Sequence, residues 1–172
     1  MRETIIPLVE ARKASIATVQ ADAIVNPSNS FGYMGGGVAK VIKNIGGQVI
    51  EDEAIACAPI QVGEAIMTTA GDLVAKKVIH APTMHDPASK TDAHQVRCAV
   101  EAALSLADEN NCRTVAIPGM GTGVGGLKKT DAAKAMIDAI RDMKFTSVQK
   151  IILLDTDEEM VAALEKELGK KR

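Results

Sequence analysis

Asp22-Ala23-Ile24-Val25-Asn26-Pro27-Ser28-Asn29, followed shortly by Gly35-Gly36-Gly37-Val38-Ala39, is the stretch of this sequence that decides the fold. The β-branched run before Pro27 is typical of a short buried strand that ends at a turn residue. The residues from Val38 onward can begin a helix. This stretch therefore predicts a strand, a glycine-rich loop (the first loop, residues 30–37) and a helix, in that order.

The same order occurs again in the second half of the chain. Residues 114–117 form another β-type run, which ends at Pro118 and leads into a second glycine-rich loop (the second loop, residues 119–126). A helix is expected after it, because apolar residues recur at helical spacing on one face. That inner face consists of Ala133, Met136, Ile137 and Ile140.

The remaining pattern extends this alternation along the chain. Apolar runs predict strands at 62–69, 77–81 and 148–154, with Pro82 expected to end the second of them, and three-and-four spacing predicts helices over 96–107 and 160–168. Alternating strands and helices favour an α/β fold with a largely parallel sheet covered by helices on both faces. No repeat or linker-like segment interrupts the chain, so we expect a single domain over residues 1–172.

Composition restricts the classes of protein that need to be considered. The chain is 47% hydrophobic and 24% charged, which is typical of a globular protein, and no apolar run is long enough for a membrane span. The N-terminus lacks the apolar core of a signal peptide, so we expect a cytoplasmic protein with no membrane partner. A net charge of −2 and only three aromatic residues do not favour nucleic acid as a partner.

The two glycine-rich loops suggest a site for an anion. A loop of this kind leaves backbone N–H groups accessible, and the N-terminus of the following helix adds partial positive charge, so phosphate can be held without a basic side chain. Two such loops at the carboxyl ends of strands could hold a diphosphate. The alternative is that the glycines only permit tight turns and close packing.

Better-known phosphate motifs do not fit. Gly121, Gly123 and Gly126 match Gly-x-Gly-x-x-Gly, but the acidic residue that a dinucleotide-binding fold needs about 20 positions later is missing. Leu127 and Lys128 stand where a P-loop has Lys-Ser or Lys-Thr. The motifs of a protein kinase are not present either.

The motifs together resemble the signature of the macro domain family: Asn-x-x-Asn at Asn26 and Asn29, then Gly-Gly-Gly-Val, then Ile-Pro and the second loop. The similarity extends from about Leu8 to the C-terminal helix. It implies a three-layer α/β/α sandwich with a mixed, mostly parallel central sheet. It also implies that ADP-ribose, or a relative such as O-acetyl-ADP-ribose or an ADP-ribosylated protein, binds across the ends of the strands.

The resemblance also implies roles for individual residues. Asn26 would shape the first loop and Asn29 would direct its amide to the distal ribose, although both could simply be turn-forming residues. Backbone amides of the two loops would hold the diphosphate. The residues expected to contact the ligand are Ser15, Ile16, Asn26, Asn29, Gly35, Gly36, Gly37, Val38, Gly119, Gly121, Thr122, Gly123, Val124 and Gly125.

Three positions depart from the family pattern. Ser15 replaces an Asp that commonly accepts a hydrogen bond from adenine, and Ala39 replaces the Asp of many hydrolytic members, so it cannot orient a water or accept a proton. Gly125 replaces an aromatic residue that packs on the distal ribose, and Phe31 or Tyr33 could partly substitute for it.

The sequence leaves three classes of function open. The first is a module that binds ADP-ribose or a derivative, with no cofactor. The second is a hydrolase or O-acetyl-ADP-ribose deacetylase in which Asn29 orients a water. The third is an interaction module with an altered pocket.

The remaining polar residues favour ordinary structural roles over chemistry. His80, His85 and His94, with Asp86 or Asp92, could supply a base, but a surface loop is the simpler interpretation. Their spacing is not that of a metal site, and the three cysteines, Cys57, Cys98 and Cys112, form no CxxC pair. No metal is expected.

Overall fold

The structure is a computed structural model, and it describes residues 2–171. Its centre is a six-stranded sheet with the strand order β1-β6-β5-β2-β4-β3. All neighbouring strands are parallel except β3 and β4, which are antiparallel, so the sheet is mixed and mostly parallel as predicted. The strands are β1 (Leu8–Lys13), β2 (Ala23–Asn29), β3 (Ile66–Thr69), β4 (Lys77–Met84), β5 (Thr114–Pro118) and β6 (Lys150–Asp155).

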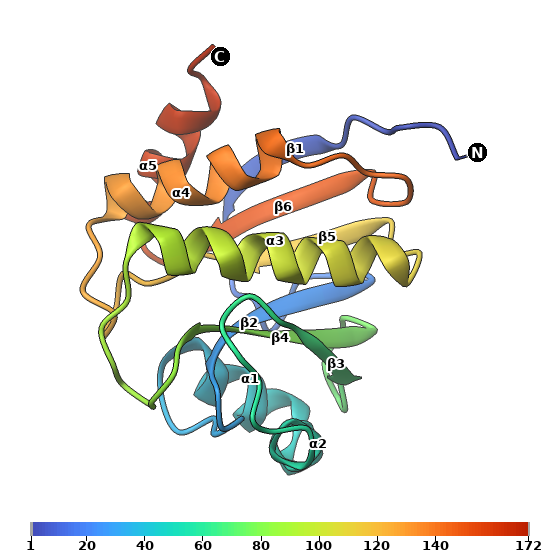
Figure 1. Cartoon of the computed structure of the whole chain (residues 1–172), viewed down its shortest axis with the longest axis vertical. Coiled ribbons are helices and arrows are strands. Elements are labelled where there is room, and N and C mark those ends of the chain that lie inside the picture. The colour runs from blue at the N-terminus through green and yellow to red at the C-terminus, as the bar shows by residue number, and fades with distance from the viewer. Residues whose placement is uncertain (1, 172) are drawn as a thin grey trace.

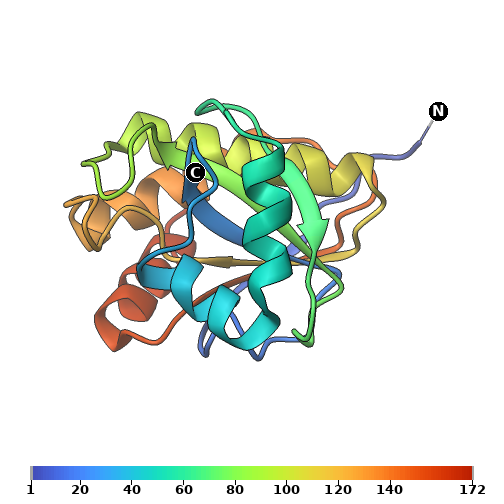
Figure 2. The same cartoon turned by 90° about the horizontal axis from the view of Figure 1, so that it is seen from below.

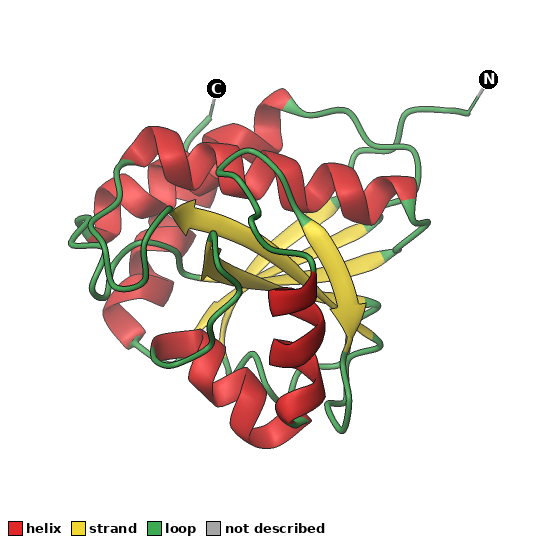
Figure 3. Ribbon diagram, turned by 60° about the horizontal axis from the view of Figure 1, so that its bottom comes forward, coloured by secondary structure: helices red, strands yellow, loops and turns green. Residues whose placement is uncertain are grey.

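Helices cover both faces of the sheet (Figures 1 and 3). They are α1 (Gly37–Gly46), α2 (Gln48–Ala56), α3 (Ala93–Glu109), α4 (Lys129–Asp142) and α5 (Glu158–Leu168). The last three pack together on one face, and α1 and α2 lie on the other, where they come to the front when the molecule is seen from below (Figure 2). This arrangement confirms the expected three-layer sandwich. No helix within residues 2–171 is long and apolar enough to span a membrane.

Side chains alternate between the two faces of the sheet along each strand, so the core consists of two apolar clusters, one on each face. Val25, Ile117 and Leu153 belong to the larger apolar cluster, which lies under α3, α4 and α5. Ile24, Ala116 and Ile152, their neighbours in sequence, belong to the cluster on the face of α1 and α2. The strands are therefore buried on both faces, which explains why their sequences read as continuous apolar runs.

Some elements differ from the prediction. Strand β1, at one edge of the sheet, and helix α2 were not predicted from the apolar pattern, and β3 is shorter than the run at 62–69. Strands β2 and β4 also continue past Pro27 and Pro82, although these residues were expected to end them. Both prolines lie where the strand has lost a neighbour on one side, because β5 pairs with β2 only at Ala23 and Ile24, and β3 pairs with β4 only up to His80. A missing N–H is tolerated at such unpaired positions.

Candidate functional site

The predicted site residues meet at one edge of the sheet. Because β1, β6, β5 and β2 are parallel neighbours, their carboxyl ends lie side by side. The chain that leaves each end supplies a part of this edge: Ser15 and Ile16 after β1, Asp155 at the end of β6, the second loop after β5 and the first loop after β2. We call this edge the crest. Ligands of open α/β sheets bind at edges of this kind.

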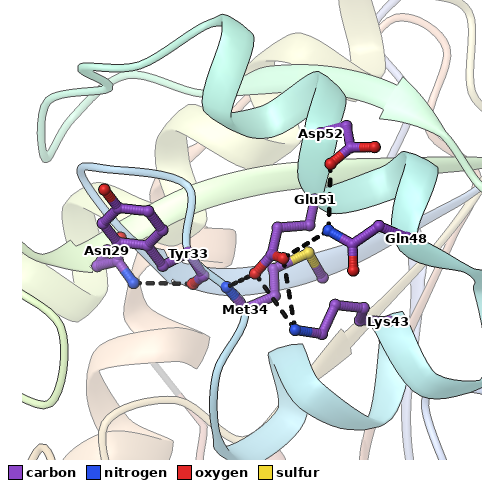
Figure 4. Close-up of polar contacts among 7 residues, drawn as sticks. All are labelled: Asn29, Tyr33, Met34, Lys43, Gln48, Glu51 and Asp52. Carbon is purple, nitrogen blue, oxygen red and sulfur yellow. Dashed lines mark hydrogen bonds and ion pairs between the residues drawn. The ribbon is translucent and has the colours of Figure 1, made fainter.

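Side chains hold the first loop in place from two directions (Figure 4). Asn29 accepts a hydrogen bond from the Phe31 amide (2.9 Å) and donates one to the Tyr33 carbonyl (2.9 Å). Glu51, on α2, accepts a hydrogen bond from the Met34 amide at 2.6 Å, directly before the three glycines. The loop therefore has a fixed shape although it is rich in glycine.

Glu51 is the residue of this site that the sequence analysis missed. Burial alone would raise the pKa of its carboxyl group, but hydrogen bonds from Gln48 and the Met34 amide, together with the nearby charge of Lys43, lower that pKa below its usual value. The carboxylate is thus charged at neutral pH and accepts several hydrogen bonds. Glu51 could have been predicted only if α2 had been identified as a helix beside the first loop.

The three glycines of the first loop leave open space in front of α1. An added Cβ at Gly35, Gly36 or Gly37 would meet no atom within 4 Å, and Gly37 has a φ of +57° that side chains rarely adopt. No side chain caps α1 at Gly36. The first amides of the helix, from Gly37, Val38 and Ala39, consequently have no partner within the helix and point their partial positive charge toward this space.

The second loop has a different construction, because most of its glycines are needed for packing. Gly121 has a φ of +79°, and an added Cβ there would lie 2.8 Å from the Thr91 side chain. An added Cβ at Gly125 would lie 2.7 Å from the Gly121 carbonyl oxygen, whereas at Gly123 it would meet nothing within 4 Å. Backbone hydrogen bonds close the loop, from the Leu127 amide to Gly121 (2.9 Å) and from the Thr91 amide to Gly125 (3.0 Å).

A row of buried polar groups supports the first loop. The Asn26 amide nitrogen lies 3.1 Å from Nδ1 of His80, and Nε2 of His80 lies 2.9 Å from the Thr68 hydroxyl, which donates to the Thr69 carbonyl. This chain is consistent with a neutral His80 that is protonated at Nε2. Burial lowers the pKa of His80 from 6.5 to about 4, so the ring is uncharged at neutral pH.

Asn26 lies within β2, three residues before the strand ends and the first loop begins. Its side chain is fully buried, and Oδ1 has no hydrogen-bond partner within the described chain. The same holds for the hydroxyl groups of Ser28 and Ser30, which follow at alternate positions. These three buried oxygens lie at alternate positions, from the middle of β2 to the first residue of the first loop.

The structure explains two of the three departures from the family pattern. Ala39 is buried among the apolar residues between α1 and the sheet, so this position contributes to packing. Gly125 is enclosed by its own loop, so a large side chain would not fit there without a shift of the backbone. Ser15 lies at the crest, where its hydroxyl accepts a hydrogen bond from the Ala17 amide at 3.2 Å, while Ile16 is buried in the core.

Aromatic side chains gather on the first loop. Phe31 and Tyr33 are stacked with ring centroids 6.0 Å apart, and His85 meets Phe31 edge-on at 5.3 Å. Tyr33 is half exposed. The histidines do not form one group, since His80 is buried and His94 lies beside Cys98 on α3. Within residues 2–171 there is no group of three or more His, Cys, Asp or Glu side chains suited to a metal ion.

Comparison with protein families identifies the fold. The family model described as "Macro domain" matches residues 25–136, which include both loops and most of α4. The chain belongs to the macro domain family. The match begins within β2, so it contains Asn26, Asn29 and the first loop of this macro domain.

Relatives and solved structures agree with this assignment. An uncharacterized protein of Aquifex aeolicus is 56% identical over 94% of this macro domain and 98% of its own length, and one of Aeropyrum pernix is 43% identical over 88% and 80%. Among solved structures, the Trypanosoma brucei macrodomain in complex with ADP-ribose is 25% identical with a TM-score of 0.83, covering 94% of this chain and 69% of that one. A variant of the Oceanobacillus iheyensis macrodomain with ADPR has a TM-score of 0.84 at 18% identity, covering 98% and 96%.

Another hollow of this macro domain lies away from the predicted site. A cavity of about 580 Å³ is lined by residues at the amino ends of several strands, including Asp22, Lys76, Thr114 and Lys150. None of the predicted ligand-binding residues lines it. The open space over the first loop belongs to the crest instead.

Proposed function

We propose that this protein binds ADP-ribose, free or attached to another molecule, across the crest. The observation that carries the proposal is the uncapped start of α1 behind three glycines with open space around them. Such a helix N-terminus attracts phosphate through its N–H groups and its dipole. The Trypanosoma brucei and Oceanobacillus iheyensis macrodomains with ADP-ribose or ADPR bound share the fold and lend the proposal support.

In this proposal the diphosphate lies between the two loops. The amides of Gly36, Gly37 and Val38 face it from the first loop, and those of Gly123 and Val124 face it from the second. Both sides are backbone, so the affinity depends on the shape of the loops and not on Lys or Arg. The hydrogen bond that Asn29 donates to the Tyr33 carbonyl and the one that Glu51 accepts from the Met34 amide fix the first loop in advance, which lowers the entropy lost on binding.

The distal ribose would then lie near the aromatic residues of the first loop. Phe31 and Tyr33 provide the apolar surface that Gly125 cannot supply. Asn29 uses one N–H of its amide for the Tyr33 carbonyl and retains the second for a ligand hydroxyl.

We propose binding without hydrolysis as the principal activity. Ala39 has no group that can orient a water or move a proton, and its side chain is directed into the core. The two histidines outside the core, His85 and His94, lie on different elements. Incubation of the protein with an ADP-ribosylated protein or O-acetyl-ADP-ribose should leave the substrate intact, and release of ADP-ribose or acetate at several turnovers would contradict this part of the proposal.

Calorimetric titration with ADP-ribose tests the proposal, with AMP, ADP and NAD as comparison ligands. We expect one-site binding in the micromolar range, which corresponds to about −8 kcal/mol. Gly123→Glu should abolish it, because the new carboxylate would repel the diphosphate. Gly123 has open space around it, so this variant should still fold.

Ser105→Glu is the matched control, because it adds the same charge at an exposed position on α3. It should bind ADP-ribose as the unmodified protein does. If the unmodified protein binds none of the four ligands, or if Gly123→Glu binds ADP-ribose with full affinity, the proposal is wrong.

A further inference from the structure

Asp155 occupies the position on the crest between the chain after β1 and the second loop. It is the last residue of β6 and pairs with Lys13 of β1. Its carbonyl accepts a hydrogen bond from the Ala14 amide (3.1 Å), and the Gly119 amide donates to the preceding residue, Leu154 (3.1 Å). Asp155 is thereby fixed beside both Ser15 and the second loop.

The carboxylate of Asp155 has one oxygen committed to the fold and one available. Oδ1 accepts a hydrogen bond from the Asp157 amide at 2.9 Å, at the turn that leads into α5. Oδ2 lies against Gly119, where an added Cβ would come within 2.6 Å of it, so the glycine makes room for this carboxylate. Within residues 2–171 no hydrogen-bond donor to Oδ2 is recorded, and the side chain is only half-buried.

The proposed ligand has a base that must lie at this end of the crest. With the diphosphate between the loops after β5 and β2, and the distal ribose near Asn29 of β2, the base extends toward β6 and β1. Ser15 offers only a neutral hydroxyl there, which already accepts a hydrogen bond from Ala17. Asp155 supplies the carboxylate that Ser15 lacks.

We infer that Asp155 accepts a hydrogen bond from the exocyclic amino group of adenine and so selects the base of the ligand. This inference rests on the proposed function. An ionised carboxylate only accepts hydrogen bonds, so it favours a 6-amino group, which donates, over a 6-oxo group, which would place two acceptors face to face. Hydrogen bonds to charged groups are also stronger than those between neutral groups.

Titration with two nucleotides tests the inference. The ligands are ADP-ribose and inosine diphosphate ribose, in which hypoxanthine carries a 6-oxo group in place of the amino group. We expect the unmodified protein to prefer ADP-ribose by about tenfold or more. Asp155→Asn keeps Oδ1 for the Asp157 amide but adds a donor, so it should weaken ADP-ribose binding and reduce this preference to less than about threefold.

Asp157→Asn is the matched control. It removes a charge two residues away while it keeps the oxygen that caps α5 at the Glu159 amide, and it should preserve the preference for ADP-ribose. Thermal unfolding of each variant shows whether it is folded. The selectivity of the unmodified protein requires no variant, so the inference can be overturned even if Asp155→Asn does not fold.

The outcomes separate the inference from the proposed function. If the unmodified protein binds neither nucleotide, the proposed function is wrong and the inference falls with it. If it binds both equally well, or if Asp155→Asn keeps the full preference for ADP-ribose, only the inference is wrong.

Discussion

The two glycine-rich loops have similar compositions but use glycine for different reasons. In the first loop, Gly35, Gly36 and Gly37 border open space, and side chains from Asn29 and Glu51 hold the backbone. In the second loop, Gly121 and Gly125 are enclosed by neighbouring atoms, and backbone hydrogen bonds hold the chain. Glycine thus leaves room for a ligand in one loop and for the loop itself in the other.

Because of this difference, substitutions in the two loops should affect different properties, the stability of the fold and the binding of the ligand. A substitution in the second loop should mainly destabilise the fold, whereas a substitution in the first loop should mainly affect the ligand. Three glycines are exceptions to this rule. Gly123 and Gly126 of the second loop have open space, whereas an added Cβ at Gly32 of the first loop would lie 2.8 Å from the Ala54 backbone. The following variants test the contrast, beginning with the largest expected effect on stability.

Gly121→Ala should lower the free energy of unfolding by about 2–5 kcal/mol. The new side chain would be forced into a left-handed conformation, at about 1–2 kcal/mol, and would press on Thr91, at about 1–3 kcal/mol. Denaturant unfolding measures the change. Gly123→Ala, in the same loop but with open space, is the control, and equal loss of stability in both variants would contradict the distinction between packed and open glycines.

The buried side chain of His80, on β4, should make the free energy of unfolding depend on pH. In the folded protein His80 has a pKa of about 4, against about 6.5 when unfolded. Between these values the unfolded chain binds a proton that the folded chain does not, so stability falls as pH decreases from about 6.5 to 4, by about 3 kcal/mol in total.

His80→Gln isolates this contribution. It removes the titrating group while the carboxylates elsewhere titrate as before, so the difference in unfolding free energy between the two proteins should change by about 3 kcal/mol between pH 7 and pH 4. A constant difference over this range would show that His80 is not buried in its neutral form.

Glu51→Gln should loosen the first loop. The variant keeps one acceptor oxygen for the Met34 amide but loses the charge that Lys43 faces, so we expect a loss of about 1–2 kcal/mol in unfolding free energy. ADP-ribose affinity should fall several-fold, because the loop is no longer fixed before binding. Asp52→Asn, on an exposed neighbour, should change neither quantity appreciably.

Gly36→Ala should have the smallest effect on stability, within about 0.5 kcal/mol. The backbone there is extended (φ −159°), any residue can adopt it, and the added Cβ meets no atom. A weaker start of α1 and a less flexible unfolded chain roughly offset each other. ADP-ribose affinity should nevertheless fall about tenfold or more, because the Cβ would enter the space proposed for the diphosphate. Reduced stability with normal ADP-ribose binding would contradict the contrast between the two loops.

The sequence predicts the framework of this fold well because its central strands are buried on both faces and its glycines gather in two loops. It does not predict β1, whose residues Glu10, Arg12 and Lys13 interrupt the apolar pattern at the edge of the sheet. It also misses α2, where Val49 and Ile55 are exposed while Ile50 and Ala54 are buried, so apolar residues lie on more than one side.

The candidate site, too, can be predicted from the sequence only in part. The motifs locate Asn29 and both loops at the crest, but they cannot show which glycines are enclosed, since this depends on Thr91 and on the fold of the loop itself. Nor can they identify Glu51, because it holds an amide of the first loop from a helix that the apolar pattern does not predict. Contacts of this kind are visible only once the strands are arranged in order.

The position of β1 also affects how the protein folds during synthesis. Strand β1 is made first, yet its only partner in the described sheet is β6, near the other end of the chain. During synthesis this edge strand must wait for residues 150–155 to leave the ribosome before it can pair. A ligand held across all four strand ends would therefore stabilise the fold only once β6 has been synthesised.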